Sequence, residues 1–198
     1  MLYRAMADKV KNLSKIRKVV LVTGARQVGK TTMLKMIKET KRNYVTLDDL
    51  NIRKLAQDDP KLFMLNYQPP IIIDEIQYAP NLLSYIKLDV DDKNNKGDYW
   101  LTGSQKFHLM KGVSESLAGR VGILEMASLS YCEKKQIPSK IFDPRNLKSE
   151  ISISPKELFE EIFKGGMPEY YVNNLSRKDF FDDYIKTYIE RDVRDLTQ

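Results

Sequence analysis

The sequence predicts an α/β fold, in which a parallel β-sheet lies between layers of helices, followed by a small helical extension. Short, continuously apolar segments of strand length alternate with segments of helical periodicity. A glycine-containing loop follows the first of these strands and leads directly into a helix. Beyond Leu129 the alternation stops and helical segments follow one another. We therefore expect a three-layer core over residues 1–130 and a mainly helical extension over residues 131–198.

Five segments are typical of strands in the core. They are short and largely apolar, as strands covered on both faces of a parallel sheet are. The segment IIID, residues 71–74, has the strongest strand character. The predicted strands cover residues 19–22, 44–47, 71–74, 99–102 and 121–126.

Helices are expected between these strands. Asp49 and Asp59 can each cap a helix N-terminus, and Pro60 suits the first position of the second of these helices. The polar segment DDKNNKGD, residues 91–98, is expected to be a loop. The predicted helices cover residues 5–16 and 31–40, a segment from Asp49 to Ala56, another from Asp59 to Leu65, and a segment that begins at Pro80.

The extension contains its own helix signals. Ser154 and Pro155 begin a helix that ends at Gly165, and a last helix runs from about Lys178 to the end of the chain. One face of the last helix is apolar and no stop signal follows it, so we expect either a further segment or a partner surface to cover that face. Its apolar residues are Phe180, Phe181, Tyr184, Ile185, Tyr188, Ile189 and Val193.

Composition narrows the class of protein. The chain has 198 residues, 30% of them charged and 42% hydrophobic, which is typical of a soluble globular protein. It contains no apolar run of about 20 residues and no secretory signal at its start. The single cysteine, Cys132, can form neither an internal disulfide nor a thiolate metal site. We therefore expect a cytoplasmic protein with no membrane partner.

The balance of charge leaves one question open. The net charge is +6, from 33 basic and 27 acidic residues. The basic residues are scattered, and their densest groups, residues 15–18 and 38–42, are short. An ordinary solvated surface is the favoured interpretation, and DNA binding is permitted but not indicated.

A complete phosphate-loop motif follows the first strand. The residues after it read GARQVGKT and match G-x-x-x-x-G-K-[ST]. Backbone N–H groups of such a loop and of the following helix bind phosphates, while Lys30 reaches the β- and γ-phosphates and Thr31 ligates Mg²⁺. The side chain of Arg26 either contacts phosphate or braces the loop. The predicted nucleotide-binding residues are Gly24, Ala25, Arg26, Gln27, Val28, Gly29, Lys30, Thr31 and Thr32.

Asp74 ends the predicted strand at residues 71–74, and Glu75 follows it directly. Open α/β sheets bind their ligands at the carboxyl ends of the strands, so Asp74 is placed to hold the Mg²⁺ shell. Glu75 is then placed to orient and polarise an attacking water. A kinase must exclude water and needs no such group, so Glu75 favours hydrolysis over transfer to a small molecule.

Two further motifs are candidates for the same site. The segment LTGSQ ends the fourth strand, and either Ser104 or Gln105 could place the water; a plain Gly-Ser turn is the alternative. Arg120, in the segment SLAGR, could neutralise charge on the transferred phosphoryl group, in its own subunit or in a neighbour's. An ordinary salt-bridged arginine explains that residue about as well.

The motifs together resemble one family. They are GARQVGKTT, IIIDEIQYAP, LTGSQ, SESLAGRV, GGMPE and YIERDVRD, and they span nearly the whole chain. These are similar to the prokaryotic AAA-type ATPases, which have an N-terminal AAA+-like domain followed by a C-terminal domain of unknown function. The resemblance implies a catalytic-glutamate phosphate-loop fold with strand order 5-1-4-3-2 and adenine as the base. It also implies the roles given above for Lys30, Thr31, Asp74 and Glu75, and a sensor role around Ser104 and Gln105.

The resemblance has consequences for assembly and for the end of the chain. AAA+ behaviour implies a homo-oligomer, with ATP near a subunit interface and Arg120 acting in trans. The C-terminal domain of the family is expected to start where this sequence stops.

Three functions are consistent with the sequence. The leading hypothesis is Mg²⁺-dependent ATP hydrolysis that drives a conformational change in an attached or partner module. The alternatives are a nucleotide-gated switch or scaffold with little turnover, and a DNA-coupled ATPase.

Overall fold

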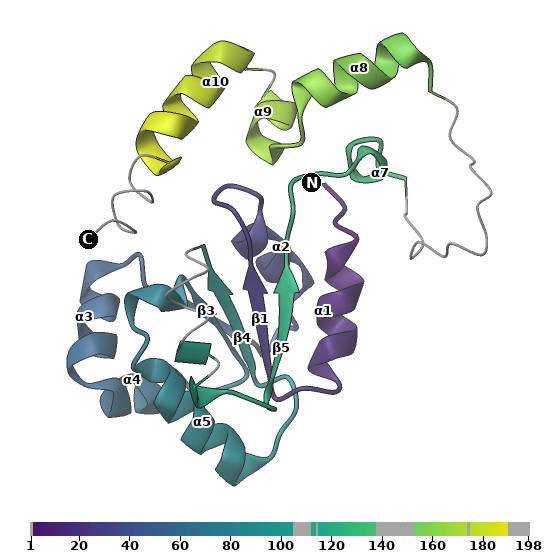
Figure 1. Ribbon diagram of the computed structural model, residues 1–198. Helices are drawn as coiled ribbons and strands as arrows, with labels where there is room; N and C mark the ends of the chain where they lie inside the picture. The colour runs from purple at the N-terminus through teal and green to yellow at the C-terminus, as the bar shows by residue number, and fades with distance from the viewer. Residues whose placement is uncertain (1, 105–111, 114, 138–152, 174, 190–198) are drawn as a thin grey trace. The chain divides into compact units, whose positions relative to one another are not determined.

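The computed structural model describes residues 2–104, 112–113, 115–137, 153–173 and 175–189 (Figure 1). The chain divides into two compact units. The first unit is Met6–Ala127, and the second is Met1–Ala5 together with Ser128–Gln198. The chain therefore leaves the second unit after Ala5 and returns to it at Ser128, whereas the sequence-based division assigned all of residues 1–130 to the core.

The first unit contains a five-stranded sheet in the order β2-β3-β4-β1-β5. This confirms the predicted order, which was written above from the other edge of the sheet. All neighbouring strands run parallel. The carboxyl ends of all five strands therefore lie at one edge of the sheet, where parallel sheets bind ligands. The strands are β1 Val19–Thr23, β2 Asn43–Thr46, β3 Ile71–Asp74, β4 Tyr99–Gly103 and β5 Val121–Glu125.

Helices cover both faces of this sheet (Figure 1). Alternate strand residues such as Leu21, Ile73 and Leu101 pack with apolar residues of α3, α4 and α5 in one core cluster. On the other face Trp100 donates a hydrogen bond from its indole nitrogen to the Ser14 hydroxyl of α1 (2.7 Å). The helices are α1 Met6–Ser14, α2 Lys30–Ile37, α3 Leu50–Asp58, α4 Pro60–Asn66 and α5 Leu82–Lys93. This is the predicted three-layer arrangement.

The loop predicted over residues 91–98 is partly wrong, because α5 continues to Lys93. Lys93 pairs with Asp89 one helical turn earlier (2.7 Å), and the helix then ends at Asn94 in the left-handed conformation. The polar composition of this segment therefore reflects both an exposed last turn of α5, residues 91–93, and a loop, residues 94–98.

The second unit is helical in the part that the structure describes. Its elements are α7 Tyr131–Lys134, α8 Pro155–Lys164, α9 Pro168–Asn173, α10 Arg177–Tyr184 and a π-helical turn, Ile185–Ile189. Ser154 caps α8 and Gly165 ends it, as predicted. The helix predicted from residue 178 onward changes to π-helical geometry at Ile185, and its predicted apolar residue Val193 lies outside the described residues.

The apolar face of the last helix is an aromatic cluster. The ring of Phe180 contacts those of Tyr170, Phe181 and Tyr184, at centroid distances of 5.6, 5.2 and 6.2 Å. None of the helices in the described ranges combines the length and the apolar character that a bilayer-spanning helix needs.

Candidate functional site

The phosphate loop connects β1 to α2, and its two glycines are required by the backbone. Gly24 has φ of +139°, and a Cβ there would lie 2.2 Å from the carbonyl oxygen of Met126. Gly29 has φ of 93° and stands at the N-cap of α2 with no side-chain capping bond. The first N–H groups of α2 therefore face the loop without a capping side chain, which suits an anion such as a phosphate.

Lys30 is the first residue of α2, and its side chain is buried against this loop. Its Nζ donates hydrogen bonds to the carbonyl oxygens of Gly24 (3.0 Å) and Ala25 (2.8 Å). Burial lowers the pKa of Lys30 from its ordinary value, and the carboxylates of Glu75 and Asp74 only partly offset this. A bound phosphate would add the negative charge that favours the ammonium form.

Asp74, at the end of β3, connects the loop to the sheet. Its Oδ1 accepts hydrogen bonds from the hydroxyls of Thr31 (2.6 Å) and Thr102, and its Oδ2 accepts one from Tyr44 (3.0 Å). Burial, followed by the charge of Asp74, raises the pKa of Tyr44, so its hydroxyl stays a neutral donor.

The donor set at this point fits Mg²⁺ rather than a metal held wholly by protein. Among the described residues no group of three or more His, Cys, Asp or Glu side chains could hold a metal ion. A hydroxyl and a carboxylate 2.6 Å apart, Thr31 and Asp74, are the kind of sparse oxygen set that Mg²⁺ shares with water and substrate phosphates. The two residues predicted as metal ligands thus lie together.

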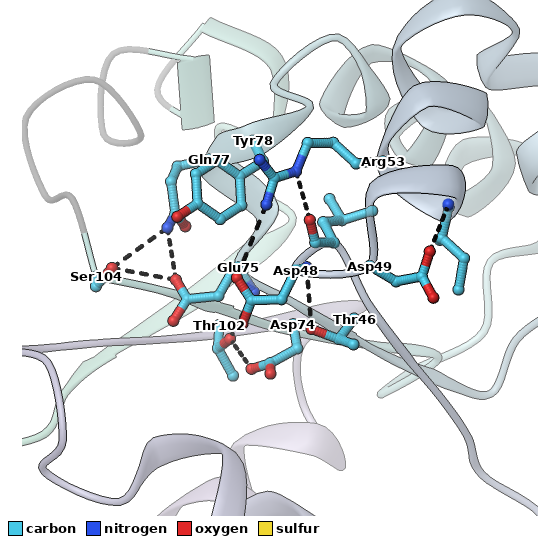
Figure 2. Close-up of polar contacts among 12 residues, drawn as sticks. Thr46, Asp48, Asp49, Arg53, Asp74, Glu75, Gln77, Tyr78, Thr102 and Ser104 are labelled. Carbon is cyan, nitrogen blue, oxygen red and sulfur yellow. Dashed lines mark hydrogen bonds and ion pairs between the residues drawn. The ribbon is translucent and has the colours of Figure 1, made fainter.

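Glu75 follows Asp74 in the left-handed conformation, with φ of 57° and ψ of 50°. Its N–H donates a hydrogen bond to the Thr102 hydroxyl of β4 (3.0 Å). Its Oε2 accepts hydrogen bonds from the Gln77 amide (2.5 Å) and the Ser104 hydroxyl (3.1 Å), as Figure 2 shows. A non-glycine residue in this region of the backbone is strained and is kept there by its surroundings.

A third carboxylate, Asp48, lies near this pair. Burial, followed by the negative charges of Glu75 and Asp74, raises its pKa, although 64% of the side chain is exposed. The guanidinium of Arg53, 3.8 Å from Asp48 Oδ1 (Figure 2), opposes that rise. The charge of Arg26 opposes it as well. Asp48 therefore adds a third negative charge near those of Asp74 and Glu75.

The structure brings most of the predicted site residues together. Lys30 and Thr31 lie beside Asp74 and Glu75, and Ser104 contacts Glu75 directly. Gln105 lies outside the described residues. The other predicted loop residues, Ala25, Arg26, Gln27 and Val28, stand between β1 and α2, and Thr32 lies in the first turn of α2.

Arg120 is not part of this site within the same chain. It immediately precedes β5, whose first residue Val121 pairs with Val19, the first residue of β1. Arg120 therefore lies at the amino ends of the strands, and it forms two hydrogen bonds with Asp91 (2.5 and 2.7 Å). A role for Arg120 toward a neighbouring subunit remains a prediction.

Sequence reasoning missed four contributors to the site: Gln77, Thr102, Tyr44 and Asp48. Thr102 carried the clearest signal, because it is a polar residue that directly follows the apolar segment YWL near the end of a strand. The contacts of Tyr44 and Asp48 depend on how separate elements meet, and that of Gln77 depends on the left-handed backbone of Glu75.

A parallel sheet with a phosphate loop after β1 and an Asp-Glu pair after β3 defines the class of P-loop NTPases. The chain belongs to the AAA domain family, whose sequence profile matches residues 16–134. A second profile, a domain of unknown function (DUF8612), matches residues 155–198, within the segment predicted as a helical extension.

Two curated proteins are similar to this chain over most of its length. Uncharacterised proteins of Mycobacterium tuberculosis and Mycobacterium bovis are each 29% identical over 182 residues, covering 90% of this chain and 36% of the relative. The chain thus spans about a third of the length of these curated relatives.

Two solved structures share the fold. AMPPCP-bound DnaA from Aquifex aeolicus superposes with a TM-score of 0.51 at 13% identity, covering 93% of this chain and 63% of that one. A Walker-type ATPase of Pyrococcus abyssi superposes with a TM-score of 0.52 at 14% identity, covering 96% of this chain and 70% of that one. At these identities the likeness shows the fold alone.

Proposed function

We propose that this chain hydrolyses ATP in a Mg²⁺-dependent reaction. The observation that carries the proposal is the hydrogen bond between Thr31 and Asp74 (2.6 Å). It joins the phosphate loop to β3, which ends immediately before Glu75, so that binding and water-activating groups share one site. Family membership and the AMPPCP-bound state of the related DnaA structure support ATP as the nucleotide.

Each residue has a role that follows from its position. The loop N–H groups and Lys30 bind the phosphates, and Thr31 and Asp74 would hold the metal. When bound, Mg²⁺ would neutralise charge on the transferred phosphoryl group. Glu75 accepts the proton of the attacking water, and Ser104 holds the carboxylate that does so.

The replacement Glu75→Gln tests this reaction. The variant should bind ATP with unchanged affinity, while turnover falls by about 100-fold or more, because the amide cannot accept the proton. Steady-state phosphate release and equilibrium binding of a fluorescent ATP analogue measure the two quantities. Asp92→Asn removes an exposed carboxylate of α5 and serves as the matched control.

The outcomes separate binding from chemistry. Unchanged turnover in Glu75→Gln would remove Glu75 from the mechanism. A parent protein that binds ATP and shows no turnover would instead support a nucleotide-gated switch.

We further propose that turnover drives a conformational change in an attached or partner module. The division of the chain into two compact units and the greater length of its relatives support this. Hydrogen exchange of the second unit, measured with ATP and with ADP, tests it. Equal protection of α7–α10 in both states would contradict the coupling.

Assembly and DNA binding remain predictions. Mass measurement in solution with and without ATP tests for a homo-oligomer. Turnover assays with added duplex and single-stranded DNA, repeated at two salt concentrations, test for a DNA-coupled ATPase.

A further inference from the structure

The side chain of Gln77 extends from the short helical turn η1, Ile76–Tyr78, to the carboxylate of Glu75. We propose that Gln77 is a positioning residue for ATP hydrolysis: its amide fixes one oxygen of Glu75 and leaves the other for the attacking water. This inference rests on the proposed function of Glu75.

Three side chains form a closed triangle of hydrogen bonds (Figure 2). The Gln77 Nε2 donates to Glu75 Oε2 (2.5 Å) and to Ser104 Oγ (3.3 Å). The Ser104 hydroxyl donates to the same Glu75 oxygen (3.1 Å). The amide nitrogen of Gln77 and the hydroxyl of Ser104 therefore both donate inside the triangle.

The chemistry of the triangle fixes the orientation of the amide. Turning the amide over would set its Oε1 against the carboxylate, and two acceptors repel each other. In the present orientation, Gln77 Oε1 is buried and accepts no hydrogen bond from the residues that the structure describes. The amide nitrogen of Gln77 is thus hydrogen-bonded while its oxygen is not. This is expected where the hydrogen bond to the charged carboxylate of Glu75 is stronger than a bond between neutral groups.

The two oxygens of Glu75 are used differently. Both donors reach Oε2, whereas no described residue donates to Oε1. The main chain of Glu75 is tied as well, since its N–H is bonded to Thr102. Because the backbone and Oε2 of Glu75 are both held, the carboxylate keeps a single orientation. Its Oε1 can then accept a proton from water, as a general base requires.

Two replacements at Gln77 test this role. Gln77→Met keeps the length of the side chain and removes both donors, while Gln77→Glu keeps its shape and opposes Glu75 with a second negative charge. The matched control is Gln57→Met, because Gln57 donates its amide to the carbonyl of Tyr78 in the same turn and does not contact Glu75.

The expected result is a change in kcat without a change in binding. Gln77→Met should lower kcat about 10-fold and Gln77→Glu about 100-fold, with KM for ATP within about twofold of the parent value. Gln57→Met should leave both constants unchanged. A residue with only a structural role would instead change KM and the melting temperature together with kcat.

Several outcomes would overturn the inference. If the parent protein is active and both Gln77 variants fold with a kcat within twofold of the parent kcat, Gln77 has no part in the mechanism. The proposed function would then remain intact. If Gln77→Met does not fold, the isosteric Gln77→Glu decides alone. A parent protein without turnover would overturn the proposed function and this inference together.

Discussion

At the scale of single residues, Asp74 is held by hydroxyls from three different elements. Thr31 comes from α2, Thr102 from β4 and Tyr44 from β2. A carboxylate with this many donors keeps one orientation before any ligand binds. The carboxylate of Asp74 is therefore already fixed in position, while the negative charges of Glu75 and Asp74 act on nearby Asp48.

The raised pKa of Asp48, caused first by burial and then by the charges of Glu75 and Asp74, predicts an effect of Asp48→Asn on stability. The pKa of Asp48 is raised in the folded chain, so the folded state holds this proton more tightly than the unfolded state. The ionised carboxylate therefore destabilises the fold at neutral pH, and the penalty vanishes below the unfolded pKa. We expect Asp48→Asn to raise the melting temperature by about 1–3 °C at pH 7 and by less as the pH falls toward 4. Thermal melts across pH without nucleotide measure this, and a gain independent of pH would contradict it.

Part of the site could be predicted from local sequence and part could not. Lys30, Thr31 and Asp74 belong to motifs whose spacing alone places them on a loop and at a strand end. The contact of Asp74 with Thr102 depends on the register of β3 with β4, in which Ile73 pairs with Leu101 one residue earlier. The role of Gln77 depends on the left-handed backbone of Glu75, which no sequence pattern signals.

At the scale of elements, helix starts were predictable because their determinants are local. Asp49 accepts hydrogen bonds from the N–H groups of Asn51 and Ile52, and Asp59 accepts one from Leu62. Helix ends were less predictable, as α5 shows, because an exposed polar turn and a loop have the same composition. Strand ends were predicted to within a residue or two, since a polar residue or glycine follows each apolar run close to the end of its strand.

The cap of α4 gives a prediction at this scale. Asp59→Ala removes the acceptor of the Leu62 N–H (2.9 Å), so we expect a loss of about 1 kcal/mol in the free energy of unfolding. Denaturant unfolding measures the loss. The neighbouring exposed residue provides the control, Asp58→Ala, which should change stability by less than about 0.5 kcal/mol. Equal losses in both variants would contradict the capping role.

At the scale of the whole molecule, the first residues of the chain belong with its end. Glu133 Oε1 accepts hydrogen bonds from Arg4 Nε (3.1 Å) and the Ala5 N–H (2.9 Å), and Oε2 accepts one from the Ser130 N–H (2.9 Å). Burial alone would raise the pKa of Glu133, but these donors outweigh it and hold the pKa below its ordinary value. The stabilisation is present at neutral pH and is lost as the pH falls through that lowered pKa.

Arg4→Ala should therefore weaken the second unit and not the nucleotide site. Leaving Glu133 without its buried partner is expected to destabilise that unit by about 3 kcal/mol. Hydrogen exchange should speed up in α7, while protection of β1 and ATP affinity stay unchanged. Arg17→Ala, which removes an exposed hydrogen bond to Gly119 in the first unit, is the control. Faster exchange confined to β1 would contradict the assignment of Arg4 to the second unit.

The chain leaves the second unit after Ala5 and returns to it at Ser128. The nucleotide-binding unit is therefore an insertion within the sequence of the second unit. During synthesis, Arg4 leaves the ribosome long before Glu133 is made, whereas every strand of the sheet is available once β5 is complete. Chains emerge N-terminus first and their domains fold as units, so the nucleotide-binding unit can fold before its host unit. The phosphate loop can therefore fold on the ribosome before Glu133 has been made and before Arg4 can pair with it.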